Sequence, residues 1–243
     1  MKSWRRFIGG LIHFVVCWWC LSLLTNNRSL PDPLETLERL WTLRHVVLLH
    51  AGASFMRVFA ALLLALIVGV PLGIFLGKSR HGGQFFSPLI YFLYPIPKVA
   101  FLPIFMLFFG LGNQSKVLLI FSVIVIQVIV SIRDAMKEIP AMYEEVLRNY
   151  TTTFRHRLYY VIWPALLPAL FGSLRVSIGI ALASLFFAEN YNTSYGVGYL
   201  ILSAWAKMDY RQMMVGVLII ALMGYGLFAM IDWLEKKVVR GRG

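Results

Sequence analysis

The sequence contains little charge, few acidic residues and little cysteine. Only 14% of its 243 residues are charged, with 11 acidic against 23 basic side chains, whereas 59% are hydrophobic. A soluble domain could not cover that much apolar surface, so the composition excludes the soluble class and indicates a membrane protein. The net charge of +12 is therefore attributed to membrane topology rather than to nucleic-acid binding.

The cysteines and histidines form no ligand pattern. Cys17 and Cys20 lie in the first apolar run without a companion cysteine or histidine pair, which predicts small buried side chains rather than a metal site. The histidines are scattered along the chain at positions 13, 45, 50, 81 and 156. We therefore expect this chain to bind no metal and no cofactor of its own.

Sequence patterns of catalysis are missing as well. The chain has no H-E-x-x-H, no G-x-S-x-G and no pair of acids in adjacent apolar runs, which argues against an intramembrane enzyme. It also lacks the phosphate-binding pattern G-x-x-x-x-G-K-[ST], so it cannot hydrolyse ATP itself. We expect a non-catalytic protein.

Long apolar runs dominate what is present. A bilayer core needs about 20 apolar residues per helix. Six windows of that kind predict membrane spans near 7–24, 54–77, 88–110, 117–132, 164–187 and 213–234. The expected fold class is thus an all-α integral membrane protein. Two further short helices are predicted at 33–41, amphipathic and interfacial, and at 199–208.

The apolar runs leave little sequence for a second domain. We expect one transmembrane domain over 1–243. It divides into a first span with an amphipathic segment (1–53), a five-span core (54–234) and a tail (235–243).

Lys and Arg counts predict the orientation of the chain. The loops on the side of the termini hold 14 basic residues and those on the other side hold 7. Because cytoplasmic loops carry the excess, both termini and the polar segment 133–163 are expected to be cytoplasmic.

The third span carries unusual residues. Pro95, Pro97 and Pro103 each remove a backbone donor, and Lys98 lies near the middle of the span. One interpretation is a bent helix that lines a pathway, because freed carbonyls are tolerated only beside neighbours or a water-filled cavity. The alternative is a helix kinked for packing, with Lys98 reaching an interface.

Two polar residues end the fifth span. Glu189 and Asn190 could line an outer gate or contact a partner, or Glu189 could be an ordinary interfacial acid. Small residues at the end of the second span, including Gly69, Gly73 and Gly77, predict a loosely wound end that permits close helix approach.

The longest polar interruption runs from Arg133 to Pro168. Within it, Glu144–Leu158 has apolar residues at helical spacing between charged ones, which predicts an amphipathic helix. Such a helix cannot bury its apolar stripe alone. It could lie against the bilayer interface, or it could enter a groove on a soluble partner.

Here the chain resembles the membrane subunits of binding-protein-dependent ABC importers. The mark of that family is a cytoplasmic E-A-A-x3-G-x9-I-x-L-P segment, and with Pro164 as its last residue Glu145 falls at the first position. Thr151 stands at the glycine position and Val161 at the isoleucine position, so the match is degenerate.

Other stretches resemble the nitrate/sulfonate/taurine branch of these permeases. They run in register from about Leu30 to Leu234. They are the GVPLGIFLGKSR run from Gly69, the PIPKVAFLPIF run from Pro95, and Ala188-Glu189 followed by the YGVGYLI run from Tyr195.

The resemblance implies a type I importer permease (MetI-like) fold in a bacterial inner membrane. It implies a second permease subunit, which we expect to make a homodimer, a cytoplasmic ABC ATPase dimer that binds ATP and Mg²⁺, and a periplasmic or lipid-anchored solute-binding protein. The residues it assigns to ATPase coupling are Glu145, Arg148, Thr151, Phe154 and Arg155.

The implied function is the translocation pathway for a small polar solute, such as a sulfonate, a nitrate-like anion or a vitamin precursor. The pathway-lining candidates are Pro95, Pro97, Lys98, Pro103, Glu189 and Asn190. The alternative is a secondary transporter or channel working without an ATPase, although neither a filter-like segment nor clear inverted repeats are present. Thr151 in place of glycine would make a tight turn less favourable there.

Overall fold

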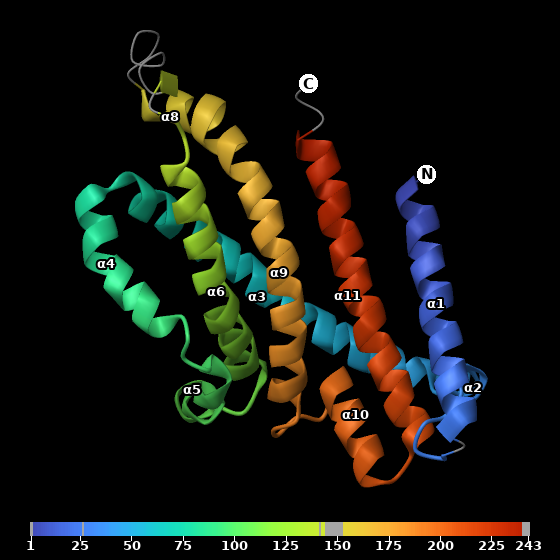
Figure 1. Ribbon diagram of the computed structural model, residues 1–243. Helices are drawn as coiled ribbons and strands as arrows, with labels where there is room; N and C mark the ends of the chain where they lie inside the picture. The colour runs from blue at the N-terminus through green and yellow to red at the C-terminus, as the bar shows by residue number, and fades with distance from the viewer. Residues whose placement is uncertain (1, 26, 141, 144–152, 240–243) are drawn as a thin grey trace. The chain divides into compact units, whose positions relative to one another are not determined.

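The computed structural model describes residues 2–25, 27–140, 142–143 and 153–239, which form helices and no strand. Figure 1 shows the order in which these helices follow one another from the N-terminus to the C-terminus. Their bounds are α1 Lys2–Thr25, α2 Pro33–Thr42, α3 Arg44–Lys78, α4 Arg80–Leu93, a 3₁₀ turn Lys98–Phe101, α5 Leu102–Phe109, α6 Asn113–Lys137, α8 Phe154–Arg157, a π-turn Leu158–Ile162, α9 Trp163–Glu189, α10 Val197–Ala206 and α11 Tyr210–Val239.

The helices group into two compact units. The first unit comprises Met1–Ser54 and Glu189–Leu222, and the second comprises Phe55–Ala188 and Met223–Gly243. Three of the helices, α3, α9 and α11, contribute residues to both units. That a single domain spans 1–243 stays a prediction.

In the first unit, α2 is the predicted amphipathic helix. The Asp32 side chain accepts a hydrogen bond from the Glu35 backbone N–H, and Pro33 occupies the first turn, where a missing donor costs nothing. Leu40 packs with Leu43 against a buried cluster of α3, α10 and α11, whereas Trp41 is 72% exposed. The cluster consists of Val47, Leu200 and Val215.

Two ion pairs join α2 to the corner between α10 and α11 in the same unit. Arg39 donates to the Asp209 carboxylate, and Arg211 lies 2.8 Å from the Glu35 carboxylate. Burial by itself would raise the pKa of Asp209, but the Gln212 backbone N–H and the Arg39 guanidinium outweigh it and lower that pKa. The corner is therefore held by a charged carboxylate at neutral pH.

In the second unit, α3 and α6 approach closely along a row of glycines. A Cβ atom built on Gly69 or Gly73 would lie 2.9 Å or 2.7 Å from side-chain atoms of Val128 or Ile132. The predicted close approach is confirmed. The predicted loose winding is wrong, because α3 stays helical through Pro71 to Lys78. Its glycines serve contact with α6 and leave the helix intact.

The fifth predicted span begins earlier than expected. A continuous helix of 35 residues covers Arg155–Glu189 and includes Pro164 and Pro168. The π-turn precedes Pro164, and there the Trp163 backbone N–H bonds to the Leu158 carbonyl, five residues back. Proline at 164 cannot donate to the preceding turn, so the wider turn lets the helix continue where sequence reasoning placed its start.

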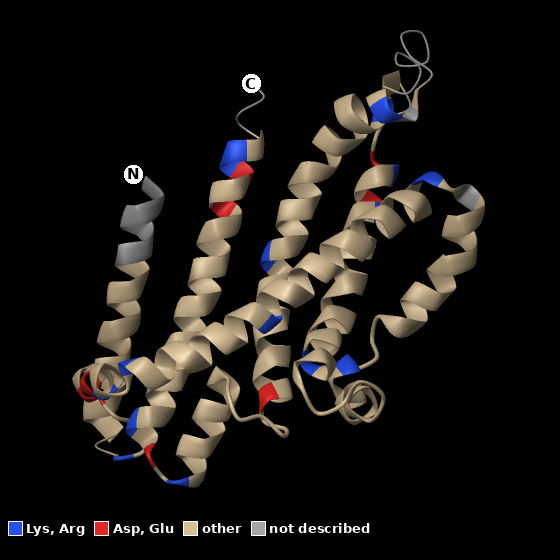
Figure 2. Ribbon diagram, turned by 180° about the vertical axis from the view of Figure 1, so that it is seen from behind, with Lys and Arg blue, Asp and Glu red and all other residues tan. Residues whose placement is uncertain are grey.

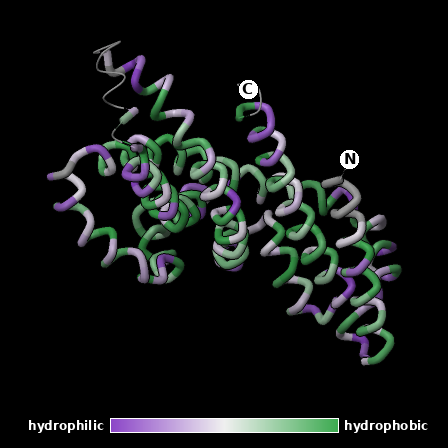
Figure 3. Tube along the Cα trace, turned by 45° about the horizontal axis from the view of Figure 1, so that its top comes forward, coloured by the Kyte–Doolittle hydropathy of each residue, from purple (hydrophilic) through white to green (hydrophobic). Residues whose placement is uncertain are grey.

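Four helices are long and apolar enough to cross a bilayer, namely α3, α6, Arg155–Glu189 and α11. His81–Leu93 and Lys98–Phe109 count as a fifth if the bent pair is one span, and Gly9–Thr25 is a shorter apolar helix. Figure 3 shows hydrophobic residues along most of the long helices, and Figure 2 shows charged residues mainly toward helix ends. The all-helical membrane fold is confirmed, while the number of six spans stays a prediction.

One smaller expectation needs correction. Cys17 and Cys20 are exposed rather than buried, because Trp18 between them occupies the inward position and donates to the Pro31 carbonyl.

A basic residue, Arg175, lies well inside α9. Its guanidinium donates to Asp232, 2.8 Å away, and to Glu235, both on α11, so two carboxylates compensate the charge there.

Candidate functional site

The third predicted span is broken, not just bent. The axes of His81–Leu93 and Lys98–Phe109 differ by 84°. Pro95 and Pro97 lie in the break, whereas Pro103 lies in the first turn of α5, where proline is favourable. The prolines thus separate two helices instead of kinking one.

Lys98 caps the broken end of α4. Its Nζ donates to the backbone carbonyls of Leu93, Tyr94 and Ile96 at 2.8, 3.2 and 3.3 Å. The last carbonyls of a helix have no intrahelical donor, and a cation near the C-terminus is favourable. The ammonium group has three N–H donors, and these three carbonyls accept all of them.

A cavity of about 440 Å³ lies beside this break, within the second unit. Of the four proline and lysine candidates, Pro97 and Lys98 line it and Pro95 and Pro103 do not. The break, α6 and α9 form its walls. The lining residues are Tyr94, Ile96, Pro97, Lys98, Val99, Val123, Ile126, Gln127, Ile180, Ala183, Ser184 and Phe187.

Polar groups in the cavity are fixed by contacts between its walls. The Tyr94 hydroxyl, at the end of α4, donates to Gln127 Oε1 on α6 at 2.8 Å. Ser184 contributes a hydroxyl from α9 and is buried. Neither Gln127 nor Ser184 was a candidate in the sequence. A glutamine and a serine inside long apolar runs are the signal that could have found them.

Glu189 has a different environment from the one expected. In the first unit its carboxylate has 0% exposure and accepts from the Ser54 hydroxyl at 2.8 Å and from the Gly198 backbone N–H at 2.8 Å. Ser54 in turn accepts from the Val197 N–H. Glu189 therefore caps the N-terminus of α10 from inside the protein.

His50 completes this capping arrangement. Its Nδ1 lies 3.0 Å from the backbone nitrogen and 2.9 Å from the backbone oxygen of Gly196, and Tyr199 stacks on its ring. His50 and Ser54 are one turn apart on α3, so both reach the first N–H groups of α10. Neither role was predicted from the sequence, because the backbone groups at the start of α10 that His50 and Ser54 contact lie 146 and 143 residues further along the chain.

The structure describes only part of the segment whose residues are expected to contact an ATPase. Glu145, Arg148 and Thr151 lie outside the described residues. Phe154 and Arg155 begin the helix that leads into α9, and Arg155 is exposed.

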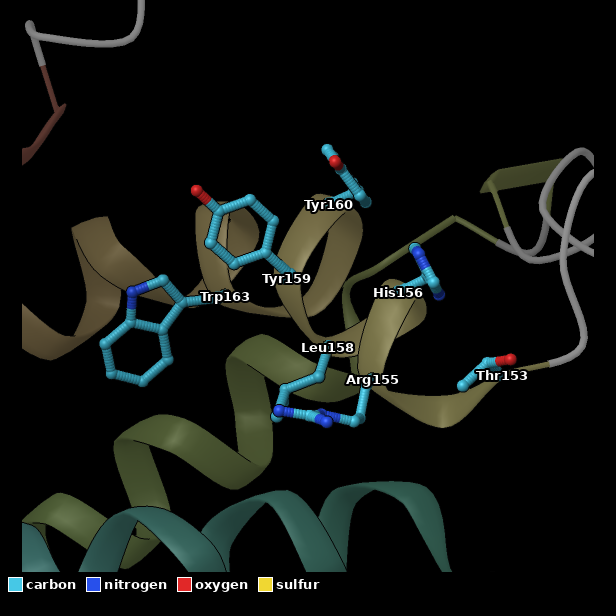
Figure 4. A pocket seen from close by; sticks show the side chains of 7 residues that line it. All are labelled: Thr153, Arg155, His156, Leu158, Tyr159, Tyr160 and Trp163. Carbon is cyan, nitrogen blue, oxygen red and sulfur yellow. The ribbon is translucent and has the colours of Figure 1, made fainter.

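A pocket of about 730 Å³ lies at this end of the helix (Figure 4). Tyr159 and Trp163 project to one side of it, and His156 stacks on Tyr160. The lining residues are Thr153, Arg155, His156, Leu158, Tyr159, Tyr160 and Trp163.

Comparison with known proteins agrees with this fold. Residues 69–241 match the family described as "Binding-protein-dependent transport system inner membrane component". The taurine transport system permease protein TauC of Escherichia coli (strain K12) is 27% identical over 245 residues, 97% of this chain and 89% of that protein. The bicarbonate transport system permease protein CmpB of Synechococcus elongatus is 27% identical over 261 residues, 99% of this chain and 94% of that protein.

A solved structure shows the same fold. A chain from inward-facing structures of the MetNI methionine ABC transporter superposes with a TM-score of 0.65 at 15% identity. The superposition covers 82% of this chain and 97% of that chain. The importer permease fold that the sequence predicted is therefore confirmed. The chain belongs to the family of binding-protein-dependent transport system inner membrane components, as a permease subunit of an ABC importer.

Proposed function

We propose that two copies of this chain form the membrane-spanning part of an ATP-driven importer. A cytoplasmic ABC ATPase dimer would bind one side and a periplasmic or lipid-anchored solute-binding protein the other. ATP and Mg²⁺ would bind to the ATPase. The family match over 69–241 supports this assembly, and the excess of basic residues near the termini favours cytoplasmic ends in a bacterial inner membrane.

The observation that carries the proposal is the exposed end of the long helix that continues into α9. Arg155, Tyr159 and Tyr160 are exposed there and surround a pocket (Figure 4). This end lies within the segment from Glu145 to Pro164 that resembles the family's coupling motif. We assign ATPase contact to Glu145, Arg148, Thr151, Phe154 and Arg155.

The transported solute would be small and polar. Relatives are named for taurine and bicarbonate, which supports an anionic or zwitterionic solute. The cavity beside Lys98 is of suitable size, since ligand sites commonly measure about 300–1,000 Å³. Pro97 and Lys98 remain our pathway candidates on this ground. Asn190 remains a candidate at the end of α9, whereas the buried Glu189 would act on the pathway there through its cap of α10 and not by lining it.

The test is copurification and stimulated ATP hydrolysis in a reconstituted complex. The double variant Glu145→Ala/Arg148→Ala and the variant Arg155→Glu should lose the ATPase or its stimulation by loaded binding protein. Arg28→Glu is the matched control, because Arg28 is exposed in the loop between α1 and α2, on the side assigned to the periplasm. If no ATPase associates with the parent chain and transport follows an ion gradient, the secondary-transporter alternative replaces the proposal.

A further inference from the structure

The cavity beside the broken span has an unusual charge balance. Among the described residues that line it, Lys98 is the one with a charged side chain, and none carries a carboxylate. Elsewhere in the second unit, Arg175 is paired with Asp232 and Glu235. The cavity therefore contains a formal positive charge that no acidic side chain in its walls compensates.

The position of this charge is fixed. Three carbonyls from Leu93, Tyr94 and Ile96 hold the Lys98 ammonium at the end of α4. Their partial charges stabilise the ammonium but do not cancel a full unit charge. A lysine held by backbone atoms needs no rearrangement when an anion arrives, and this preorganisation lowers the entropic cost of binding.

The walls of the cavity formed by α6 and α9 contribute hydrogen-bond donors. Because Gln127 Oε1 accepts from Tyr94, the orientation of the amide is fixed and its two N–H groups remain for another acceptor. The Ser184 hydroxyl adds a third donor. Ile180 and Phe187 supply an apolar surface next to these groups. Donors around one cation, beside an apolar wall, suit a small monoanion with or without a short apolar part.

We propose that this cavity is an anion site within the permease itself. Lys98 would act as its fixed charge, and Gln127 and Ser184 would donate to the solute. The inference rests on the proposed function, and it adds that the membrane subunit selects for charge, so selection would not be confined to the binding protein. A single cation matches one negative charge, and weak binding suffices because the solute must also leave.

The charge preference can be measured with thiol reagents, without knowing the natural solute. Cys17 and Cys20 are the only two cysteines of the chain, so a Cys17→Ser/Cys20→Ser background is free of thiols. Gln127→Cys then places one thiol in the cavity. The probes are the anionic 2-sulfonatoethyl and the cationic 2-(trimethylammonium)ethyl methanethiosulfonates. The cysteine thiolate attacks the sulfenyl sulfur, a mixed disulfide forms and methanesulfinate leaves.

Gln114→Cys is the matched control, because Gln114 is an exposed glutamine on the same helix and does not line this cavity. The anion-to-cation rate ratio at position 127 should exceed the control ratio by about tenfold, the factor expected for unit charges several ångströms apart in a water-filled space. Lys98→Gln should reduce the ratio to that of the control, whereas Lys98→Arg should preserve it.

The inference is overturned if the ratio at position 127 equals the control ratio, or if Lys98→Gln leaves it unchanged. Ser184→Cys, a smaller change, repeats the measurement and keeps Gln127. The inference is also overturned if neither Gln127→Cys nor Ser184→Cys reacts with the reagents although both variants elute like the parent in gel filtration. The reagents need neither the ATPase nor the binding protein. Loss of ATPase copurification with a preserved charge preference would therefore refute the proposed function and leave the anion site standing.

Discussion

Replacing Gly73 by alanine tests the packing of α3 on α6 most directly. The new Cβ would lie 2.7 Å from Ile132 Cβ and 3.0 Å from the Ile129 carbonyl oxygen, whereas ordinary contacts begin at 3.4 Å. The two helices would have to move apart by a large fraction of an ångström, because a Cβ and a backbone oxygen cannot move away by changing rotamer.

Overpacking of this kind costs about 1–3 kcal/mol, and the better helix propensity of alanine offsets up to about 1 kcal/mol. We expect a net destabilisation of about 1–2 kcal/mol, equivalent to a fall of roughly 2–8 °C in the unfolding midpoint for a chain of this size. The assay heats detergent-purified protein and measures the fraction that stays monodisperse in gel filtration.

The control is Gly179→Ala on α9, where nothing lies within 4 Å of the new Cβ. This variant should match or slightly exceed the parent in stability. Gly69→Ala should cost less than Gly73→Ala, because its nearest contact is a terminal methyl group of Val128 at 2.9 Å. If Gly73→Ala is as stable as the parent, or if the control falls equally, the close approach is not what holds this helix pair.

Two further predictions concern the first unit. Glu189→Ala should destabilise the protein by about 2–5 kcal/mol, because the Gly198 N–H and the Ser54 hydroxyl lose their acceptor in a buried place. Glu189→Gln retains an acceptor oxygen and should cost less. Equal unfolding midpoints for the two variants would contradict the capping role. The pKa of Asp209 lies below its ordinary value of 3.8, so its ion pair with Arg39 stabilises the folded state above that pH and is lost as the pH falls through the lowered pKa. The midpoint of the parent should therefore fall below about pH 4 more steeply than that of Asp209→Asn, measured by the same heating assay at pH 3 to 7, and parallel curves would refute the assignment.

Long apolar runs and small residues in the sequence were enough to predict the helices, because burial and contact with lipid favour apolar residues along a whole helix and do not depend on single positions. The glycines facing α6 and the amphipathic α2 were predictable for the same reason. The ends of the helices were less predictable. The α3 helix begins at Arg44 and α11 at Tyr210, since residues outside the apolar windows also adopt helical conformation. The break at Pro95 and Pro97 was foreseen as a bend because proline acts locally.

The site residues were harder to predict, because their roles depend on partners distant in the chain. Glu189 was expected at an outer gate, at a partner contact or as an ordinary interfacial acid. Instead, its carboxylate accepts from Ser54, 135 residues away, and from the first turn of α10. The backbone contacts of Lys98 were not predicted either, since it binds the carbonyls that the break in the third predicted span exposes. Proline at 164 suggested a helix start, and only the π-turn shows how the helix passes through it.

The uninterrupted helix from Arg155 to Glu189 also has a mechanical consequence. At 35 residues it is about 52 Å long, at 1.5 Å per residue. If such a rod tilts by about 10° around one end, the other end moves by roughly 9 Å. Small rotations imposed near Arg155 would thus be amplified toward the Glu189 end of the helix.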